Sequence, residues 1–176
     1  MKTIKLGLDI HGVLSELNEI DIENLIEDLN NNFPKFNFEL HVISGKPVME
    51  QLIELLHIHK QDLSKFRSFH SIIEHIYCSR KWYENSHPNF KIWKDDKDEW
   101  WASPEEVWWN SKGIICANND IDILVDNDLR YRNNAEEHGV YFIHFNPRFE
   151  SYRDLLTNIE EYIEALKALS WLLVDG

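Results

Sequence analysis

Cysteine is scarce in this chain, which has only Cys78 and Cys116 among its 176 residues. The two cysteines are far apart in sequence and form no CxxC pair, so neither a disulfide framework nor a structural zinc motif is indicated. Proteins that carry structural disulfides are found mainly in oxidising compartments. We therefore expect a reducing, cytoplasmic location.

Positive charge is also in short supply. The chain has 18 Lys and Arg residues against 31 Asp and Glu residues, which gives a formal net charge of -13. A surface with this balance repels phosphate backbones, so we expect no extended nucleic-acid surface. A small phosphorylated substrate remains compatible, because one metal ion or one well-placed lysine acts locally.

Long apolar runs are missing as well. The N-terminal stretch contains Asp9 and His11 and is too short and too polar for a signal peptide or a membrane span. A hydrophobic content of 43% and a charged content of 28% are typical of globular chains. We expect a single domain over residues 1–176 and no membrane; the sequence indicates no oligomeric state.

Short apolar runs alternate with amphipathic stretches through the first half of the chain. Residues 4–10 and 38–43 are typical of buried strands. Between and after them, apolar residues recur at helical spacing over 18–29 and 48–58. The first half therefore predicts the order strand, helix, strand, helix.

The middle of the chain carries weaker signals. Residues 65–69 favour a third strand, and 71–78 favour a short helix capped by its serine. Residues 90–93 and 99–101 flank a polar turn, which predicts a small β-hairpin within an insertion of about residues 80–103.

The last third returns to regular alternation. A serine, a proline and two glutamates from residue 103 onward are in the order that starts a helix, and this helix would carry Lys112. Strands are then expected over 121–125 and 140–145, and helices over 131–138 and 150–169. Strands that alternate with helices predict an α/β fold: a three-layer, Rossmann-like, mostly parallel sheet with helices on both faces.

Polar side chains stand where the expected strands end. Asp9, Ser44, Asp126 and Asp128 all occupy such positions. In an open parallel sheet the ligand crevice lies at the carboxyl ends of the strands, so these groups should converge there. Carboxylates held close together repel each other, and a hard divalent cation bound through oxygen relieves the repulsion. Mg²⁺ is the natural candidate.

This arrangement suits phosphoryl transfer. With the cation screening its charge, Asp9 could attack phosphorus and form an aspartyl-phosphate, which splits hydrolysis into two easier displacements. The Ser44 hydroxyl and the Lys112 ammonium would hold the phosphoryl oxygens.

The motifs resemble those of the haloacid dehalogenase-like (HAD) superfamily. In that family a first strand ends in DxDGT/V, followed by a strand-end Ser or Thr, a helix-borne Lys and a strand-end acidic cluster. Here these are Asp9-Ile10-His11-Gly12-Val13, Ile43-Ser44-Gly45, Lys112 and Val125-Asp126-Asn127-Asp128, in the family's order. The resemblance covers approximately residues 4 to 145, and the chain is similar in size to small, minimally capped members, which include phosphatases and deoxyribonucleotidases.

The resemblance implies a role for each matching residue. Asp9 would be the nucleophile and a metal ligand. The backbone carbonyl of His11 and the carboxylates of Asp126 and Asp128 would complete the metal site. Ser44 and Gly45 would bind the substrate phosphate, with Lys112 as a further catalytic residue.

One residue departs from the family pattern. The second position of the first motif is usually an aspartate that protonates the leaving group and then deprotonates water, and here it is His11. A histidine with a pKa near 6.5 can do both tasks, which makes His11 a candidate catalytic residue. The same substitution is also compatible with another reaction or with lost activity.

Plainer roles stand beside these. Ser44 could cap the helix near Val48, Asp128 could cap the helix that starts near Leu129, and Lys112 could be a solvated helix residue. The tryptophans between Trp82 and Trp109 could form a small core under the hairpin, or a lid that stacks on a base.

Two functions follow. The first is a Mg²⁺-dependent HAD-like hydrolase, a phosphatase acting on a small phosphorylated metabolite or nucleotide through Asp9. The alternative is a catalytically silent HAD-like binding protein. A receiver-type signalling domain is disfavoured, because its phosphorylated aspartate lies on a middle strand and its acidic pair near the first strand.

Overall fold

A computed structural model describes the backbone of residues 1–175 and the side chains of residues 1–170. Its main sheet has five strands in the order β3-β2-β1-β6-β7, and every neighbouring pair is parallel. The strands are β1 (Lys2–Leu8), β2 (Phe36–Ser44), β3 (Phe66–Ser71), β6 (Ile123–Asp126) and β7 (Tyr141–His144). The predicted α/β class is confirmed, and this sheet is wholly rather than mostly parallel.

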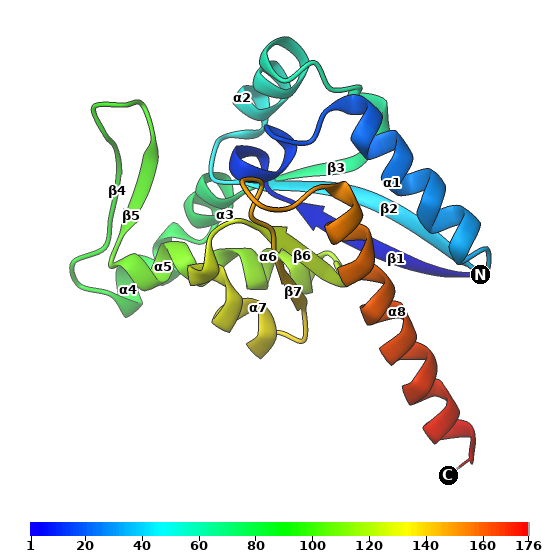
Figure 1. Ribbon diagram of the computed structural model, residues 1–176. Coiled ribbons are helices and arrows are strands. Elements are labelled where there is room, and N and C mark those ends of the chain that lie inside the picture. Colours follow the sequence, from blue (N-terminus) through cyan, green and yellow to red (C-terminus); the bar gives the residue numbers. More distant parts are fainter. Residues whose placement is uncertain (176) are drawn as a thin grey trace.

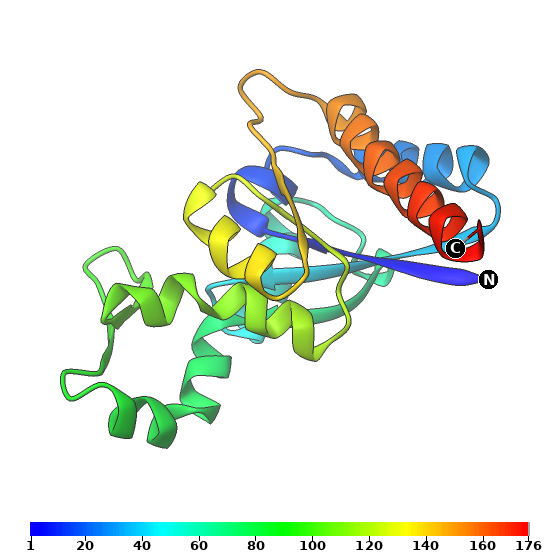
Figure 2. The ribbon, with the colours of Figure 1, turned by 90° about the horizontal axis from the view of Figure 1, so that it is seen from below.

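Helices cover both faces of the sheet, as predicted. Figure 2 shows α1 (Glu19–Asn32) and α8 (Tyr152–Asp175) together on one side of the strands. The other side is covered by α3 (Ile72–Cys78), α6 (Ser111–Asn118) and α7 (Arg132–Glu137). Successive side chains of a strand point to opposite faces of the sheet, so the structure has two hydrophobic cores. Val42 packs toward α1 and α8, and Ile43 packs toward α3 and α6.

The chain order places β1 at the middle of the sheet. It pairs with β2 on one side and with β6 on the other, so the strand order reverses at β1. Leu8 stands opposite both Val42 and Val125, and the three strands therefore end at the same edge (Figure 1). Ligands bind open α/β sheets at such a switch point.

Two predicted helices differ in detail from the structure. The helix expected over 48–58 begins as α2 (Val48–Ile53) and continues to Ile58 as a wider turn. The helix expected from Ser103 is split into α5 (Glu105–Trp109) and α6 by Asn110. There the Ser111 hydroxyl donates to the Trp108 carbonyl at 2.5 Å, and such local side-chain bonds compete with helical ones.

The predicted hairpin is confirmed. Strands β4 (Lys91–Lys94) and β5 (Trp100–Ser103) pair antiparallel and form a sheet of their own. They project from the body of the molecule (Figure 1), beyond the short helix α4 (Arg80–Ser86), which the sequence did not predict. Across residues 1–175, the structure has no helix that is at once long and apolar enough to cross a membrane.

Candidate active site

Three charged side chains meet at the carboxyl end of β1. The Lys112 ammonium donates to Asp9 Oδ1 at 3.0 Å and to Asp126 Oδ2 at 2.5 Å. Asp9 follows β1 directly, Asp126 ends β6, and Lys112 lies in the first turn of α6. The two carboxylates therefore lie within reach of one cation, as the strand-end positions predict.

This cluster is buried. The side chains of Lys112 and Asp126 are 1% and 0% exposed, and that of Asp9 is 13% exposed. Burial alone would lower the pKa of Lys112, but the charges of Asp126 and Asp9 outweigh it and raise this pKa. Burial raises the pKa of Asp126, and the charge of Asp9 raises it further, against the opposing effect of Lys112. Lys112 is thus a fixed buried cation and not a solvated helix residue.

The turn after β1 carries His11, and its shape depends on Gly12. It covers Ile10–Leu14 and is closed by a bond from the Leu14 amide to the Asp9 carbonyl at 3.2 Å. Gly12 has a φ of 85°, and a Cβ there would lie 2.4 Å from Asn127 Cγ. Both the backbone angle and this close approach require glycine.

Asn127 links this turn to Asp126. With its amide turned so that hydrogen bonds form, Nδ2 donates to the His11 carbonyl at 2.9 Å and lies 3.3 Å from Asp126 Oδ1. In the other orientation Asn127 Oδ1 would face the His11 carbonyl oxygen and Asp126 Oδ1. The His11 carbonyl oxygen and Asp126 Oδ1 are oxygens of the type that Mg²⁺ prefers as ligands.

Ser44 and Gly45 lie beside this cluster, at the end of β2. Ser44 is buried, and the capping role weighed for it is wrong, because Pro47 occupies the N-cap of α2 and no side chain caps that helix. A Cβ on Gly45 would lie 2.7 Å from Trp108 Cζ2. The Ser44–Gly45 segment and the indole of Trp108 are therefore in close contact.

His11 is held by a residue that the sequence did not single out. Its Nε2 lies 2.9 Å from Glu54 Oε1, which also accepts a bond from Lys46 Nζ at 2.7 Å. This bond to Glu54 raises the pKa of His11 despite partial burial. Burial would raise the pKa of Glu54, but His11 and Lys46 lower it to about 2. Glu54 is thus a buried anion that orients a partly exposed imidazole.

Asp128 has the capping role that the sequence left open. Its carboxylate accepts from the Arg130 amide at 3.0 Å at the start of a short helical turn over Leu129–Tyr131. The same carboxylate pairs with the Arg130 guanidinium at 2.6 Å. This guanidinium lies 3.8 Å from the centroid of the Trp109 ring. Asp128 thereby connects the edge of the sheet to the tryptophan-rich segment.

A cavity of about 250 Å³ opens over these groups. It brings together every residue that the sequence assigned to the site except Lys112, which is buried beneath it. Its lining consists of Asp9, His11, Ser44, Gly45, Lys46, Glu99, Trp100, Trp101, Trp108, Trp109, Asp126, Asn127, Asp128, Arg130 and Tyr131.

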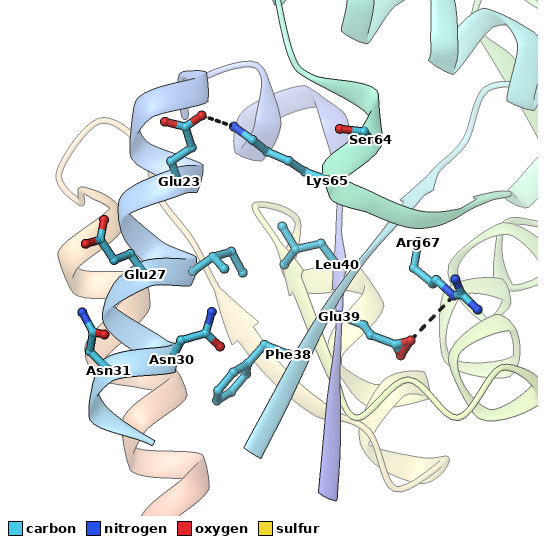
Figure 3. A pocket seen from close by; sticks show the side chains of 11 residues that line it. Glu23, Glu27, Asn30, Asn31, Phe38, Glu39, Leu40, Ser64, Lys65 and Arg67 are labelled. Carbon is cyan, nitrogen blue, oxygen red and sulfur yellow. Dashed lines mark hydrogen bonds and ion pairs between the residues drawn. The ribbon is translucent and has the colours of Figure 1, made fainter. Parts of the chain in front are cut away.

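A larger cavity of about 630 Å³ lies elsewhere, between α1 and strands β2 and β3 (Figure 3). Both cations of its rim are paired with carboxylates of the rim, with Lys65 Nζ 2.9 Å from Glu23 Oε1 and Arg67 Nε 3.8 Å from Glu39 Oε1. It lies away from the strand ends and contains no buried charge cluster. We therefore place the chemistry in the smaller cavity.

Three contributors to the site lie outside the motifs: Lys46, Glu54 and Tyr131. Lys46 is a sequence neighbour of Gly45, and that proximity is the one signal that could have found it. Asn127 lies within the fourth motif but was assigned no role from the sequence. The Tyr131 ring lies 4.4 Å from Lys112 Nζ and stacks beneath its charge. In the part of the chain that the structure describes, no three His, Cys, Asp or Glu residues form a metal-binding group by themselves.

Comparison of the chain with models of protein families, with curated proteins and with solved structures finds no match. The functional argument therefore rests on the geometry of this site.

Proposed function

We propose that the protein is a Mg²⁺-dependent hydrolase that removes phosphate from a small phosphorylated compound through Asp9, as the resemblance to the HAD superfamily implies. The observation that carries the proposal is the bridge from Lys112 to both Asp9 and Asp126, which lie 103 and 14 residues away in sequence. One buried cation between two strand-end carboxylates fits a site for phosphoryl transfer.

The donor set fits a hard cation. Asp9, Asp126 and the His11 carbonyl would hold the cation through oxygen, and Asn127, which lies 2.9 Å from that carbonyl, would join them with its amide turned to present Oδ1. Because three acidic or imidazole ligands are not grouped in the described residues, backbone and amide oxygens would complete the coordination. When bound, Mg²⁺ supplies charge neutralisation for the phosphoryl oxygens and the Asp9 carboxylate.

Asp9 acts as the nucleophile. One of its carboxylate oxygens attacks phosphorus and forms an acyl-phosphate bond, while the bond from phosphorus to the leaving oxygen breaks. Lys112 holds the other Asp9 oxygen at 3.0 Å and fixes the direction of attack. A water molecule then attacks the phosphoryl group and regenerates the Asp9 carboxylate with release of inorganic phosphate.

His11 transfers the protons for both steps. It gives one proton to the departing oxygen and takes one from the attacking water, so the imidazole returns to its first state. Its raised pKa favours the protonated form needed for the first step. Glu54 keeps the ring at the rim of the cavity that Asp9 lines.

The test is phosphate release from a panel of monoesters in the presence of Mg²⁺. Turnover should require Mg²⁺ and should be abolished by Asp9→Asn. The matched control is Asp120→Asn, since Asp120 is exposed and precedes β6 at the opposite end of the sheet. Turnover that survives Asp9→Asn would overturn the role of Asp9.

A binding protein without turnover is the second candidate. The observation in its favour is that His11 replaces the usual aspartate and has its Nε2 engaged by Glu54 at 2.9 Å. Binding of phosphomonoesters without release of phosphate from any member of the panel would decide for this alternative.

A further inference from the structure

A second cavity of about 340 Å³ adjoins the one over Asp9. The two cavities share four lining residues: Trp101, Trp108, Trp109 and Arg130. The second cavity extends toward the hairpin, where Trp93 completes its aromatic lining. A ligand anchored over Asp9 would therefore meet this aromatic wall with the rest of its structure.

The rings of Trp101, Trp108 and Trp109 are fixed by contacts with neighbouring side chains. The Trp101 indole donates to Asp95 Oδ2 at 2.8 Å, and the Trp108 indole donates to the Tyr131 hydroxyl at 3.0 Å. The Trp109 ring meets the Tyr131 ring edge-on, with centroids 4.9 Å apart. A wall that is ordered before the ligand arrives loses little conformational entropy on binding.

The aromatic wall is also connected, through side-chain contacts, to Lys112 and Gly45, the residues proposed to hold the phosphate. Tyr131 contacts Trp108 and Trp109 and lies 4.4 Å beneath the ammonium of Lys112. Trp108 packs directly on Gly45. These contacts fix the distance between the phosphate end and the aromatic end.

We propose that the site takes phosphomonoesters whose organic part is a planar aromatic group stacked on the wall of Trp93, Trp101 and Trp109. This inference rests on the proposed function and names its substrate class. Stacking on aromatic side chains serves any ring with a π-face. Nucleoside monophosphates and aryl phosphates share this chemistry, and the experiment separates them.

The experiment measures equilibrium binding by calorimetry, with the full chain carrying Asp9→Asn and with Mg²⁺ present. The ligands are adenosine and uridine monophosphates, phenyl phosphate, ribose 5-phosphate and inorganic phosphate. We expect the aromatic phosphates to bind about 5- to 150-fold more tightly than ribose 5-phosphate, the range of one base stacked on an aromatic side chain. Tighter binding of the nucleotides than of phenyl phosphate identifies a nucleobase as the aromatic group, and the reverse order identifies a simple aryl group.

Substitution of the wall tests where the ring binds. Trp93→Leu should remove most of the preference for aromatic ligands and leave the affinity for ribose 5-phosphate within about twofold. Trp93 is 44% exposed on the hairpin, so its loss leaves the core intact. Trp109→Leu is a second variant from the other side of the cavity. Trp82→Leu is the matched control, because Trp82 is 63% exposed and lines neither cavity.

Each contrary outcome has one meaning. Equal affinities for ribose 5-phosphate and the aromatic phosphates would overturn the substrate class and leave the proposed function standing. Equal weakening of all ligands by both tryptophan variants would also overturn it, because the wall would then act only on folding. No binding of any ligand, inorganic phosphate included, by this variant and also by the native chain would overturn both proposals.

Discussion

The Nε2 atom of His11 lies 2.9 Å from Glu54 Oε1, although 43 residues separate the two in sequence. Glu54 is only 10% exposed and accepts a second bond from Lys46 at 2.7 Å. The carboxylate therefore has little freedom to move, and the imidazole that it holds is fixed at the mouth of the cavity. The role of His11 depends on this pair.

Loss of the Glu54 carboxylate should impair protonation of the leaving group. We expect Glu54→Gln to slow hydrolysis of alkyl phosphates about tenfold, and His11→Ala about 100-fold or more, as for the loss of a general acid. With p-nitrophenyl phosphate the first step should change little, because its leaving group needs no proton, so the burst of p-nitrophenolate should be retained. Pre-steady-state kinetics on this substrate and steady-state kinetics on the alkyl phosphates measure the difference.

The same variant provides a spectroscopic check. Because the bond to Glu54 raises the pKa of His11, Glu54→Gln should lower that pKa in an NMR titration. Glu50→Gln is the control on the same helix, since Glu50 does not contact His11. An equal loss of rate on the alkyl phosphates and in the p-nitrophenolate burst would show that Glu54 supports only the fold.

Removal of the Lys112 ammonium should destabilise the protein strongly. Lys112→Met leaves the carboxylates of Asp9 and Asp126 side by side without their cation, and breaking such a buried pair costs about 3–5 kcal/mol. Urea denaturation without added Mg²⁺ measures the loss. Lys81→Met, at an exposed position of α4, should change stability by less than about 0.5 kcal/mol. A similarly small loss for Lys112→Met would contradict its place in the buried cluster.

The contact between Gly45 and Trp108 should resist even one added methyl group. Gly45→Ala places a Cβ 2.7 Å from the Trp108 ring, and overpacking of this kind costs about 1–3 kcal/mol. Trp108→Phe removes the atoms that clash but also loses the bond to Tyr131. We expect the double variant to be more stable than the sum of the two single losses predicts, as measured in a double-mutant cycle. If the two losses of stability simply added, the contact between the new methyl group at position 45 and the Trp108 ring would have no effect on the free energy of unfolding.

Stability should fall as the pH drops from neutrality toward 4, in part because of His41. Burial lowers the pKa of His41 to about 4, and the ring lies 2.5 Å from the Ser68 hydroxyl. The unfolded chain binds this proton near pH 6.5, so acidification between those values favours unfolding by up to about 3 kcal/mol. Denaturation curves of the native chain and His41→Gln should converge as the pH falls. A constant difference between them would exclude this cause.

The succession of β1, β2 and β6 along the chain could be predicted because each of these strands is a short apolar run that ends in or just before a polar residue. Asp9, Ser44 and Asp126 follow such runs directly, and parallel pairing then brings their positions to one edge. Lys112 could be placed from the order of the motifs alone. Its burial depends on α6 packing against the sheet, which the local sequence does not determine.

Glu54 could not be predicted in the same way. It lies in a helical segment with an ordinary amphipathic pattern, and its contact with His11 exists only because β2 and α2 return the chain to the end of β1. The break at Asn110 was missed for a related reason, since one side-chain bond from Ser111 decides it. Such contacts depend on tertiary geometry and leave no periodic signal.

The hairpin of β4 and β5 shares no backbone ladder with the five-stranded sheet in the part of the chain that the structure describes. The groups proposed for bond breaking belong to the sheet edge, and Trp93 and Trp101, proposed for selecting the substrate, belong to the hairpin. A replacement of the hairpin between Phe90 and Ser103 would thus alter substrate selectivity and leave the ion pairs of Lys112 with Asp9 and Asp126 in place. The molecule is in this sense modular, and libraries confined to that loop offer a direct route to variants with new preferences.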